Sequence, residues 1–191
     1  MQRTLLLLLL LCLSFHPACA DDAPAPGGDG PDLVGPTPGE RPLRALPDTG
    51  TAFPPALKAV LENADTIELF AMDPESGTRT ETIPTVAAFH DYRFLNRAPL
   101  EDSGLRHELV RLYYQAVFRS EGRAALCFLP RHALRATRGA EQVDVLACFE
   151  CLQLRWWGPG SLEGSATIDD GDVAALDELY ARAGLTIARN D

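Results

Sequence analysis

Two apolar segments joined by a polar loop constrain the fold of this chain more than any other feature. The first, Ala124–Leu129, ends at Pro130, and the second, Val143–Trp157, is rich in β-branched and aromatic residues. Both compositions are typical of strands, and the polar residues 135–141 between them predict an exposed loop. Because neighbouring strands joined in this way most often pair antiparallel, the pattern predicts a hairpin.

The hairpin carries every cysteine outside the N-terminal hydrophobic segment, namely Cys127, Cys148 and Cys151. Folding the chain about the loop brings Cys127 near Cys148. We therefore predict that Cys127 is disulfide-bonded in an oxidising compartment, with Cys148 preferred over Cys151 as its partner. A Cys148–Cys151 disulfide is disfavoured, because three residues of strand separate the Cα atoms by about 10 Å, beyond the ~7 Å that a disulfide spans. It requires a turn at Phe149-Glu150.

Two alternatives use the same cysteines. Together with His132, the three cysteines make up a Cys₃His ligand set, which predicts a zinc or copper site. The C-x-x-C spacing is also found in thiol-redox sites, although a glutamate between the two cysteines opposes thiolate formation. A candidate ligand cluster comprises Arg131, His132, Glu150 and Cys151. Within it, a cross-strand ion pair between Arg131 and Glu150 is the simpler interpretation.

The N-terminal residues 1–20 predict that the protein is exported. Arg3 precedes an unbroken leucine run, which leads to Phe15-His16-Pro17 and then to Ala18-Cys19-Ala20. This pattern is typical of a signal peptide over residues 1–20. The run is too short to span a membrane, so the mature form is expected to have no transmembrane helix. Lipid modification at Cys19 is the alternative to cleavage after Ala20. Residues 21–53 are rich in Pro and Gly and predict a disordered tether, which leaves 54–191 as a single domain.

The domain is predicted to be α+β. Apolar residues at helical spacing indicate helices that begin at Pro54-Pro55, at Asp102-Ser103 and after the capping pair Asp169-Asp170. Strands are expected at 66–72, 80–83, 86–95 and 162–168, in addition to the hairpin. We therefore expect an antiparallel sheet of four to five strands, with the helices packed mainly on one face.

The sequences C-F-L-P-R-H at Cys127–His132 and V-D-V-L-A-C-F-E-C at Val143–Cys151 resemble an uncharacterised family of small bacterial secreted or lipoprotein-like proteins. The resemblance extends from about Leu57 to Leu185 and includes the closing A-G-L at Ala183–Leu185. It implies that the hairpin is the common feature of the family, and it implies no mechanism.

Charge and motifs narrow the function classes. The formal net charge of −10 argues against nucleic acid as a partner. The sequence contains no G-x-S-x-G, H-E-x-x-H or glycine-rich phosphate loop, so no enzyme class is indicated. We expect an exported, non-catalytic binding or structural module of the periplasm, outer cell envelope or extracellular space. Its expected partner is a protein or small-molecule ligand, and no cofactor is expected. A metal-binding domain and a thiol-redox protein are the alternatives.

Overall fold

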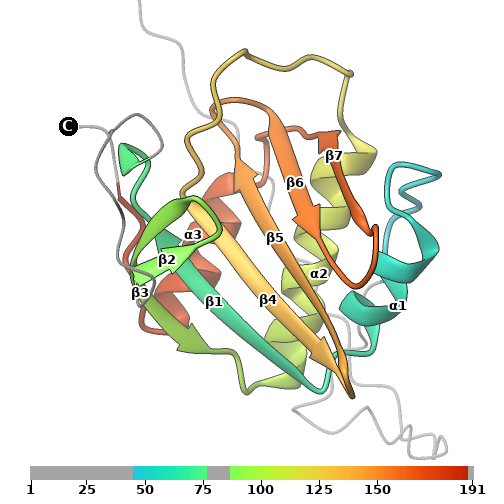
Figure 1. The fold of residues 1–191 in the computed structure, drawn as a ribbon. Helices are drawn as coiled ribbons and strands as arrows, with labels where there is room; N and C mark the ends of the chain where they lie inside the picture. The colour runs from blue at the N-terminus through green and yellow to red at the C-terminus, as the bar shows by residue number, and fades with distance from the viewer. Residues whose placement is uncertain (1–44, 77–86, 189–191) are drawn as a thin grey trace, which may run out of the picture. The chain divides into compact units, whose positions relative to one another are not determined.

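A computed structural model describes residues 45–76 and 87–188 (Figure 1). In this part of the chain the elements are, in order, α1 (Pro55–Glu62), β1 (Thr66–Met72), β2 (Ala88–Phe89), β3 (Tyr92–Pro99), α2 (Ser103–Phe118), β4 (His132–Arg138), β5 (Glu141–Cys148), β6 (Gln153–Trp157), β7 (Glu163–Thr167) and α3 (Val173–Arg182). The strands form one curled sheet in the order β2-β3-β1-β4-β5-β6-β7, and every neighbouring pair is antiparallel. The predicted α+β class and antiparallel sheet are confirmed, but the described sheet has seven strands rather than four to five.

Strand β4 occupies residues that the sequence predicted to be a loop. Leu134 and Ala136 are buried in the main core, while Arg135 points to the opposite face and binds Asp144 of β5 through two hydrogen bonds of 2.8 Å. The two arginines and one threonine of β4 obscure the alternation of buried and exposed residues that is typical of a half-buried strand. The true hairpin, β4–β5, turns through a two-residue loop in which Gly139 has a φ of +56°. Residues 124–129, predicted to be a strand, instead form neither helix nor strand and lie outside the sheet.

Two strands predicted to be continuous are each broken by a tight turn. Val143–Trp157 forms β5 and β6, separated by a turn in which Leu152 has a φ of +54° and donates its N–H to the carbonyl oxygen of Phe149 (3.1 Å). The 86–95 region likewise forms β2 and β3 on either side of His90, whose φ is also +54°. Neither turn has glycine or proline at its left-handed position, so the usual sequence signal is missing.

The helices agree more closely with the sequence. Leu57, Val60 and Leu61 of α1 are buried, as their spacing predicted. Helix α2 begins at the predicted cap, where the Asp102 side chain accepts a hydrogen bond from the N–H of Leu105 (2.8 Å). The predicted Asp169-Asp170 cap of α3 is wrong. The cap position is two residues after Asp170, at Asp172, whose side chain makes no capping hydrogen bond.

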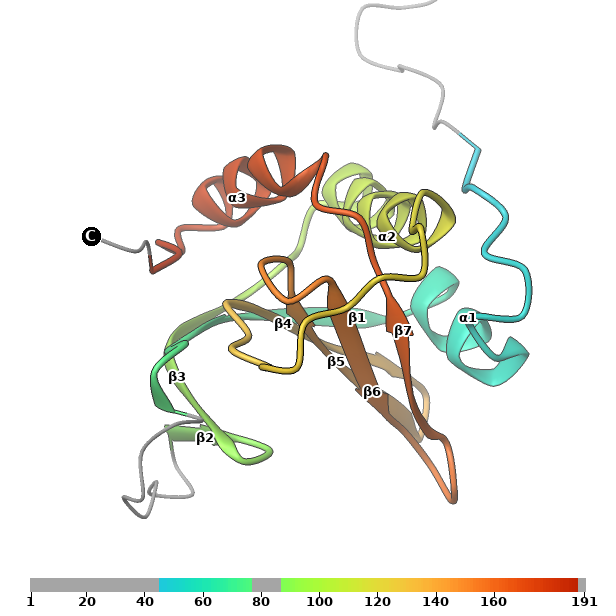
Figure 2. The same cartoon turned by 90° about the horizontal axis from the view of Figure 1, so that it is seen from above.

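The curl of the sheet creates two apolar clusters. The main core joins all three helices to one face of β1, β4, β5 and β6. The second cluster lies on the opposite face, where the sheet end carrying β2 and β3 bends away from the helices, as Figure 2 shows. Strand β5 contributes to both, with Val145 in the main core and Leu146 in the second cluster. From Val143 to Cys148, the residues on both faces of β5 are therefore buried.

The folded domain begins earlier than the sequence predicted. Phe53, placed at the end of the tether, is 1% exposed and packs edge-on against Tyr114 and Trp156. Thr49 is also buried, and Leu46 packs against the core. An aromatic ring in the core offsets the ordering entropy that composition alone suggested would prevail. The predicted signal peptide, Cys19, tether residues 21–44 and strand 80–83 lie outside the described residues.

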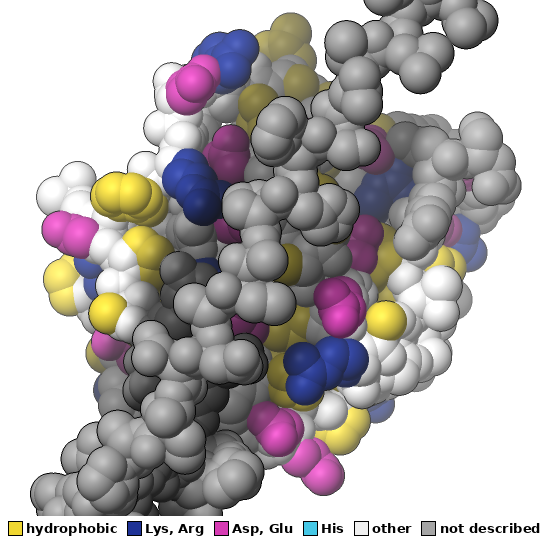
Figure 3. Space-filling model, turned by 180° about the vertical axis from the view of Figure 1, so that it is seen from behind, with side chains coloured by type: hydrophobic (Ala, Val, Ile, Leu, Met, Phe, Trp, Pro, Cys, Tyr) yellow, Lys and Arg dark blue, Asp and Glu magenta, His cyan; other side chains and the backbone are white. Residues whose placement is uncertain are grey.

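The surface mixes both signs of charge. On the face seen from behind in Figure 3, acidic and basic side chains are interspersed among apolar ones. Within residues 45–76 and 87–188, no helix has the length and apolar character needed to cross a membrane.

Candidate functional site

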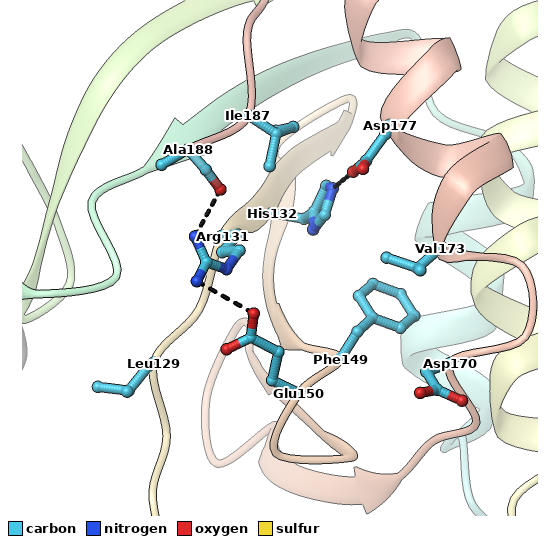
Figure 4. Close-up of a pocket in the computed structure, with 10 residues that line it drawn as sticks. All are labelled: Leu129, Arg131, His132, Phe149, Glu150, Asp170, Val173, Asp177, Ile187 and Ala188. Atoms are coloured by element: carbon cyan, nitrogen blue, oxygen red, sulfur yellow. Dashed lines mark hydrogen bonds and ion pairs between the residues drawn. The ribbon is translucent and has the colours of Figure 1, made fainter. Parts of the chain in front are cut away.

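A cavity of about 320 Å³ lies where the start of β4, the β5–β6 turn, α3 and the C-terminal segment meet (Figure 4). It is lined by Leu129, Arg131, His132, Phe149, Glu150, Asp170, Val173, Asp177, Ile187 and Ala188. The sequence predicted a ligand cluster of Arg131, His132, Glu150 and Cys151. The structure brings the first three to this cavity and places Cys151 outside its lining.

His132 is the most deeply buried polar group of the cavity. It begins β4, and its side chain is 2% exposed. Its Nε2 lies 2.8 Å from Oδ1 of Asp177 on α3, while its Nδ1 is buried and has no hydrogen-bond partner among the described residues. Figure 4 shows Nδ1 on the ring edge away from Asp177. Because the carboxylate accepts the Nε2 proton in the neutral ring, Nδ1 carries the lone pair.

Burial determines the protonation state of His132. Desolvation lowers the pKa of the imidazole below its ordinary value of 6.5, and the nearby guanidinium of Arg131 lowers it further. The hydrogen bond to Asp177 and its charge act in the opposite direction but do not prevail. The ring is therefore neutral at pH 7, and its free nitrogen is a hydrogen-bond acceptor.

Packing holds the ring in a fixed orientation. The rings of Phe149 and Tyr180 both stand edge-on to His132, at 5.5 Å and 4.9 Å between ring centres. The Tyr180 hydroxyl donates to the carbonyl oxygen of Ala133 (2.7 Å), which ties α3 to β4 next to the histidine. The His132–Asp177 pair therefore depends on the docking of α3.

Arg131 ties three segments together at the cavity. Its guanidinium lies 3.0 Å from Oε1 of Glu150 in the β5–β6 turn, which is the ion pair expected from the sequence. It also donates a hydrogen bond to the carbonyl oxygen of Ala188. The arginine side chain is 12% exposed and that of Glu150 is 52% exposed. Arg131, which directly precedes β4, thus holds both the β5–β6 turn and the C-terminal segment at this end of the strand.

The cavity combines an acidic lining with apolar walls. Its carboxylates are those of Glu150, Asp170 and Asp177, and they outnumber the guanidinium of Arg131. Leu129, Phe149, Val173 and Ile187 supply the apolar walls. No serine, threonine or cysteine is among the described residues of the lining, so the Asp177–His132 pair has no adjacent nucleophile there. The arrangement suits binding of a group that donates hydrogen bonds or carries positive charge.

The three cysteines lie together but pair differently from the prediction. Cys148 forms a disulfide with Cys151, and Cys127 has a free, exposed thiol. The turn at Phe149–Leu152 replaces the extended strand assumed from the sequence, and it brings the Cα atoms of Cys148 and Cys151 to 5.1 Å. The predicted Cys127–Cys148 disulfide is therefore replaced by the pair that an extended strand would have excluded.

The four predicted metal ligands are not assembled into a metal site in the described structure. The His132 ring bonds to Asp177, and two of the three cysteine sulfurs are joined to each other. Among residues 45–76 and 87–188, no group of three or more His, Cys, Asp or Glu side chains is placed to hold a metal ion.

Sequence reasoning missed Asp170 and Asp177 as members of the site. Asp170 was assigned to helix capping, and Asp177 lies on a helix 45 residues from its histidine partner. The only sequence feature that could have indicated Asp177 is its place beside Leu176, at the edge of the buried face of the helix.

Comparison of the chain with protein families, curated proteins and solved structures gives no match.

Proposed function

We propose that the protein is an exported, non-catalytic binding module whose ligand site is the cavity at His132. The observation that carries the proposal is the buried, unpartnered Nδ1 of His132 beside a partly apolar cavity with an acidic lining. A buried acceptor without a partner costs about 1–3 kcal/mol, which a donor from a ligand can recover. Export rests on the N-terminal pattern of Arg3, the leucine run and Ala20.

The lining defines the chemical class of ligand. Three carboxylates against one guanidinium favour a protonated amine over an anion. The walls formed by Leu129, Phe149 and Val173 favour an apolar group attached to that amine. A small aromatic or aliphatic amine, free or at the end of a larger molecule, satisfies both requirements.

Benzylamine is a suitable probe, with benzyl alcohol and benzoate as neutral and anionic controls. We expect benzylamine at millimolar concentration to shift amide NMR signals of residues 129–132, 149–150 and 173–177 in the intact chain. Benzyl alcohol should bind more weakly, and benzoate should leave these signals unchanged. Equal binding of benzoate, or shifts confined to another surface, would refute the proposed ligand class.

Two variants test the contribution of the lining. Glu150→Gln and Asp177→Asn should each weaken benzylamine binding by roughly threefold to tenfold, which corresponds to the free energy of one ordinary hydrogen bond. Glu163→Gln, on the exposed edge strand β7, is the matched control and should bind as the unsubstituted chain does. Unchanged affinity in both lining variants would show that the carboxylates do not bind the amine.

A further inference from the structure

The second candidate site is the cluster of three sulfur atoms near the β5–β6 turn. Cys148 and Cys151 are joined and buried, at 1% and 0% exposure. The Sγ of Cys127 lies 3.5 Å from the Sγ of Cys151, and Cys127 is exposed. An accessible thiol is therefore in contact with one sulfur of a buried disulfide.

Backbone and side-chain contacts hold Cys127 in this position. The N–H of Ala125 donates to the carbonyl oxygen of Cys151 (2.9 Å). The side-chain amide of Gln153, at the start of β6, donates to the carbonyl oxygens of Ala125 and Cys127. The segment that carries the thiol is thus fastened to the turn that carries the disulfide, so the sulfur contact is part of the fold.

Two amide groups point at the disulfide sulfurs. The N–H of Leu129 lies 3.3 Å from Sγ of Cys151, and the N–H of Cys151 lies 3.2 Å from Sγ of Cys148. Amide donors stabilise negative charge on sulfur, which develops on the sulfur that leaves during thiol–disulfide exchange. The sulfur of Cys148 is therefore prepared to leave when the sulfur of Cys151 is attacked.

We propose that Cys127, Cys148 and Cys151 form an intramolecular thiol–disulfide exchange site. Cys127 loses its proton to solvent, and its thiolate attacks Sγ of Cys151. The Cys127–Cys151 bond forms, the Cys148–Cys151 bond breaks, and the electron pair of the broken bond stays on Cys148, which takes a proton from water. The exchange consumes no oxidant or reductant, and it converts an exposed thiol into a buried one.

The exchange changes the covalent link across the β5–β6 turn. Cys148 and Cys151 enclose Phe149 and Glu150, which line the cavity at His132. With Cys151 bonded to Cys127, this turn is no longer closed on itself. The position of the disulfide is thereby coupled to the presentation of Glu150 to Arg131.

Disulfide mapping tests the proposal directly. The full chain with Cys12 and Cys19 replaced by Ser keeps only the three domain cysteines. This protein is incubated at several pH values, and the exchange is then stopped with acid. After denaturation in acid, free thiols are alkylated with N-ethylmaleimide, and the disulfides are mapped without reduction. We expect two isomers, one alkylated at Cys127 and one at Cys148. The rate of approach to their equilibrium should rise about tenfold per pH unit while the thiol form predominates. Alkylation confined to Cys127 at every pH, including alkaline pH, would overturn the proposal.

A matched pair of variants tests the sulfur contact by another route. On exposure to glutathione disulfide, Cys148→Ser should form a Cys127–Cys151 disulfide and retain no glutathione. Cys127 first displaces one glutathione from the reagent, and Cys151 then displaces the other. Cys151→Ser lacks the contacting sulfur and should remain a glutathione adduct at Cys127. Internal disulfide formation at equal rates in the two variants would show that the contact does not direct the exchange.

Discussion

Two histidine–aspartate pairs in the described structure have opposite burial. In the cavity pair, the histidine side chain of His132 is 2% exposed and its partner Asp177 is 34% exposed. In the other pair, which joins the β2–β3 turn to β5, His90 is 25% exposed and Asp144 is 7% exposed. The distances from Nε2 to the carboxylate are similar, 2.8 Å and 3.0 Å. Geometry alone therefore does not distinguish them.

Their surroundings determine different ionisation states. Burial lowers the pKa of His132 and keeps the ring neutral. Burial also disfavours the charge on Asp144, but hydrogen bonds from Arg135 and His90 outweigh it, so the pKa of that carboxyl is below its ordinary value of 3.8. The first pair contains a buried neutral base, whereas the second contains a buried anion held by two donors.

The difference separates a candidate site from a structural contact. His132 has a buried nitrogen without a partner beside its cavity. His90 also borders a surface cavity, but its ring is partly exposed, stacks on Trp157 with 4.0 Å between ring centres and links the β2–β3 turn to the sheet. The buried nitrogen without a partner is therefore what marks the His132–Asp177 pair as the candidate site. The pair at Asp144 is explained by the fold.

The largest expected effect is the loss of the buried anion. Asp144→Asn should lower the free energy of unfolding by about 2 kcal/mol, because Arg135 loses its charged partner. The value is below the range for fully buried pairs, since the Arg135 side chain is 35% exposed. Urea denaturation measures it, with Glu163→Gln as the surface control. A loss no larger than that of the control would mean that water replaces the carboxylate.

The next largest effect is expected in the pH dependence of stability, because His132 is neutral in the folded protein. Because the pKa of His132 is lowered in the folded state, the unfolded chain binds a proton first as the pH falls below 6.5. Stability should be fully present above that pH and decline as the pH falls through the lowered folded value. His132→Gln should lack this component of the decline, as measured by urea denaturation between pH 8 and pH 5. Parallel profiles for the two proteins would contradict the assignment.

A smaller loss is expected at the exposed partner of the cavity pair. Asp177→Asn should lower the free energy of unfolding by about 1 kcal/mol, because Asn keeps an acceptor for Nε2 and the position is partly solvated. Chemical denaturation under the conditions used for Asp144→Asn gives the direct comparison. If Asp177→Asn lowers the free energy of unfolding more than Asp144→Asn does, the His132–Asp177 pair is the one that stabilises the fold.

An effect of similar size to that of Asp177→Asn concerns the backbone at His90. Both His90→Ala and His90→Gly remove the ring that stacks on Trp157, but only glycine adopts the φ of +54° without steric cost. His90→Gly should therefore be more stable than His90→Ala by about 1 kcal/mol. Thermal unfolding compares the two variants. Equal stability would show that the turn changes conformation when the ring is removed.

Local sequence patterns were sufficient to predict helices but not all of the strands. Leu57, Val60 and Leu61 repeat at helical spacing, and Asp102 supplies a side-chain cap, so α1 and the start of α2 could be predicted. Strand β4 could not be predicted, because Arg135 is a polar residue whose partner, Asp144, lies on a different strand, β5. From local composition, Arg135 is simply a polar residue typical of a loop. Its place in a strand is explained by the pairing of β4 with β5.

The candidate site divides in the same way. Arg131, His132 and Glu150 are close to the central hairpin in sequence, and their proximity followed from the expected folding of that segment. Asp177 joins them through the docking of α3, which depends on contacts between distant segments. The identity of the disulfide was missed for a related reason, because Leu152 adopts a left-handed conformation that nothing in its residue type signals.

The sequence by itself determined the α+β class, the antiparallel pairing, the buried faces of the helices and the gathering of three cysteines in one region, because these depend on periodicity and short-range order. Only the tertiary structure decided which cysteines pair, which residues surround His132 and which of its nitrogens lacks a partner. These features arise where a turn, a helix and a C-terminal segment meet, and the free energy that fixes them comes from burial shared between those segments.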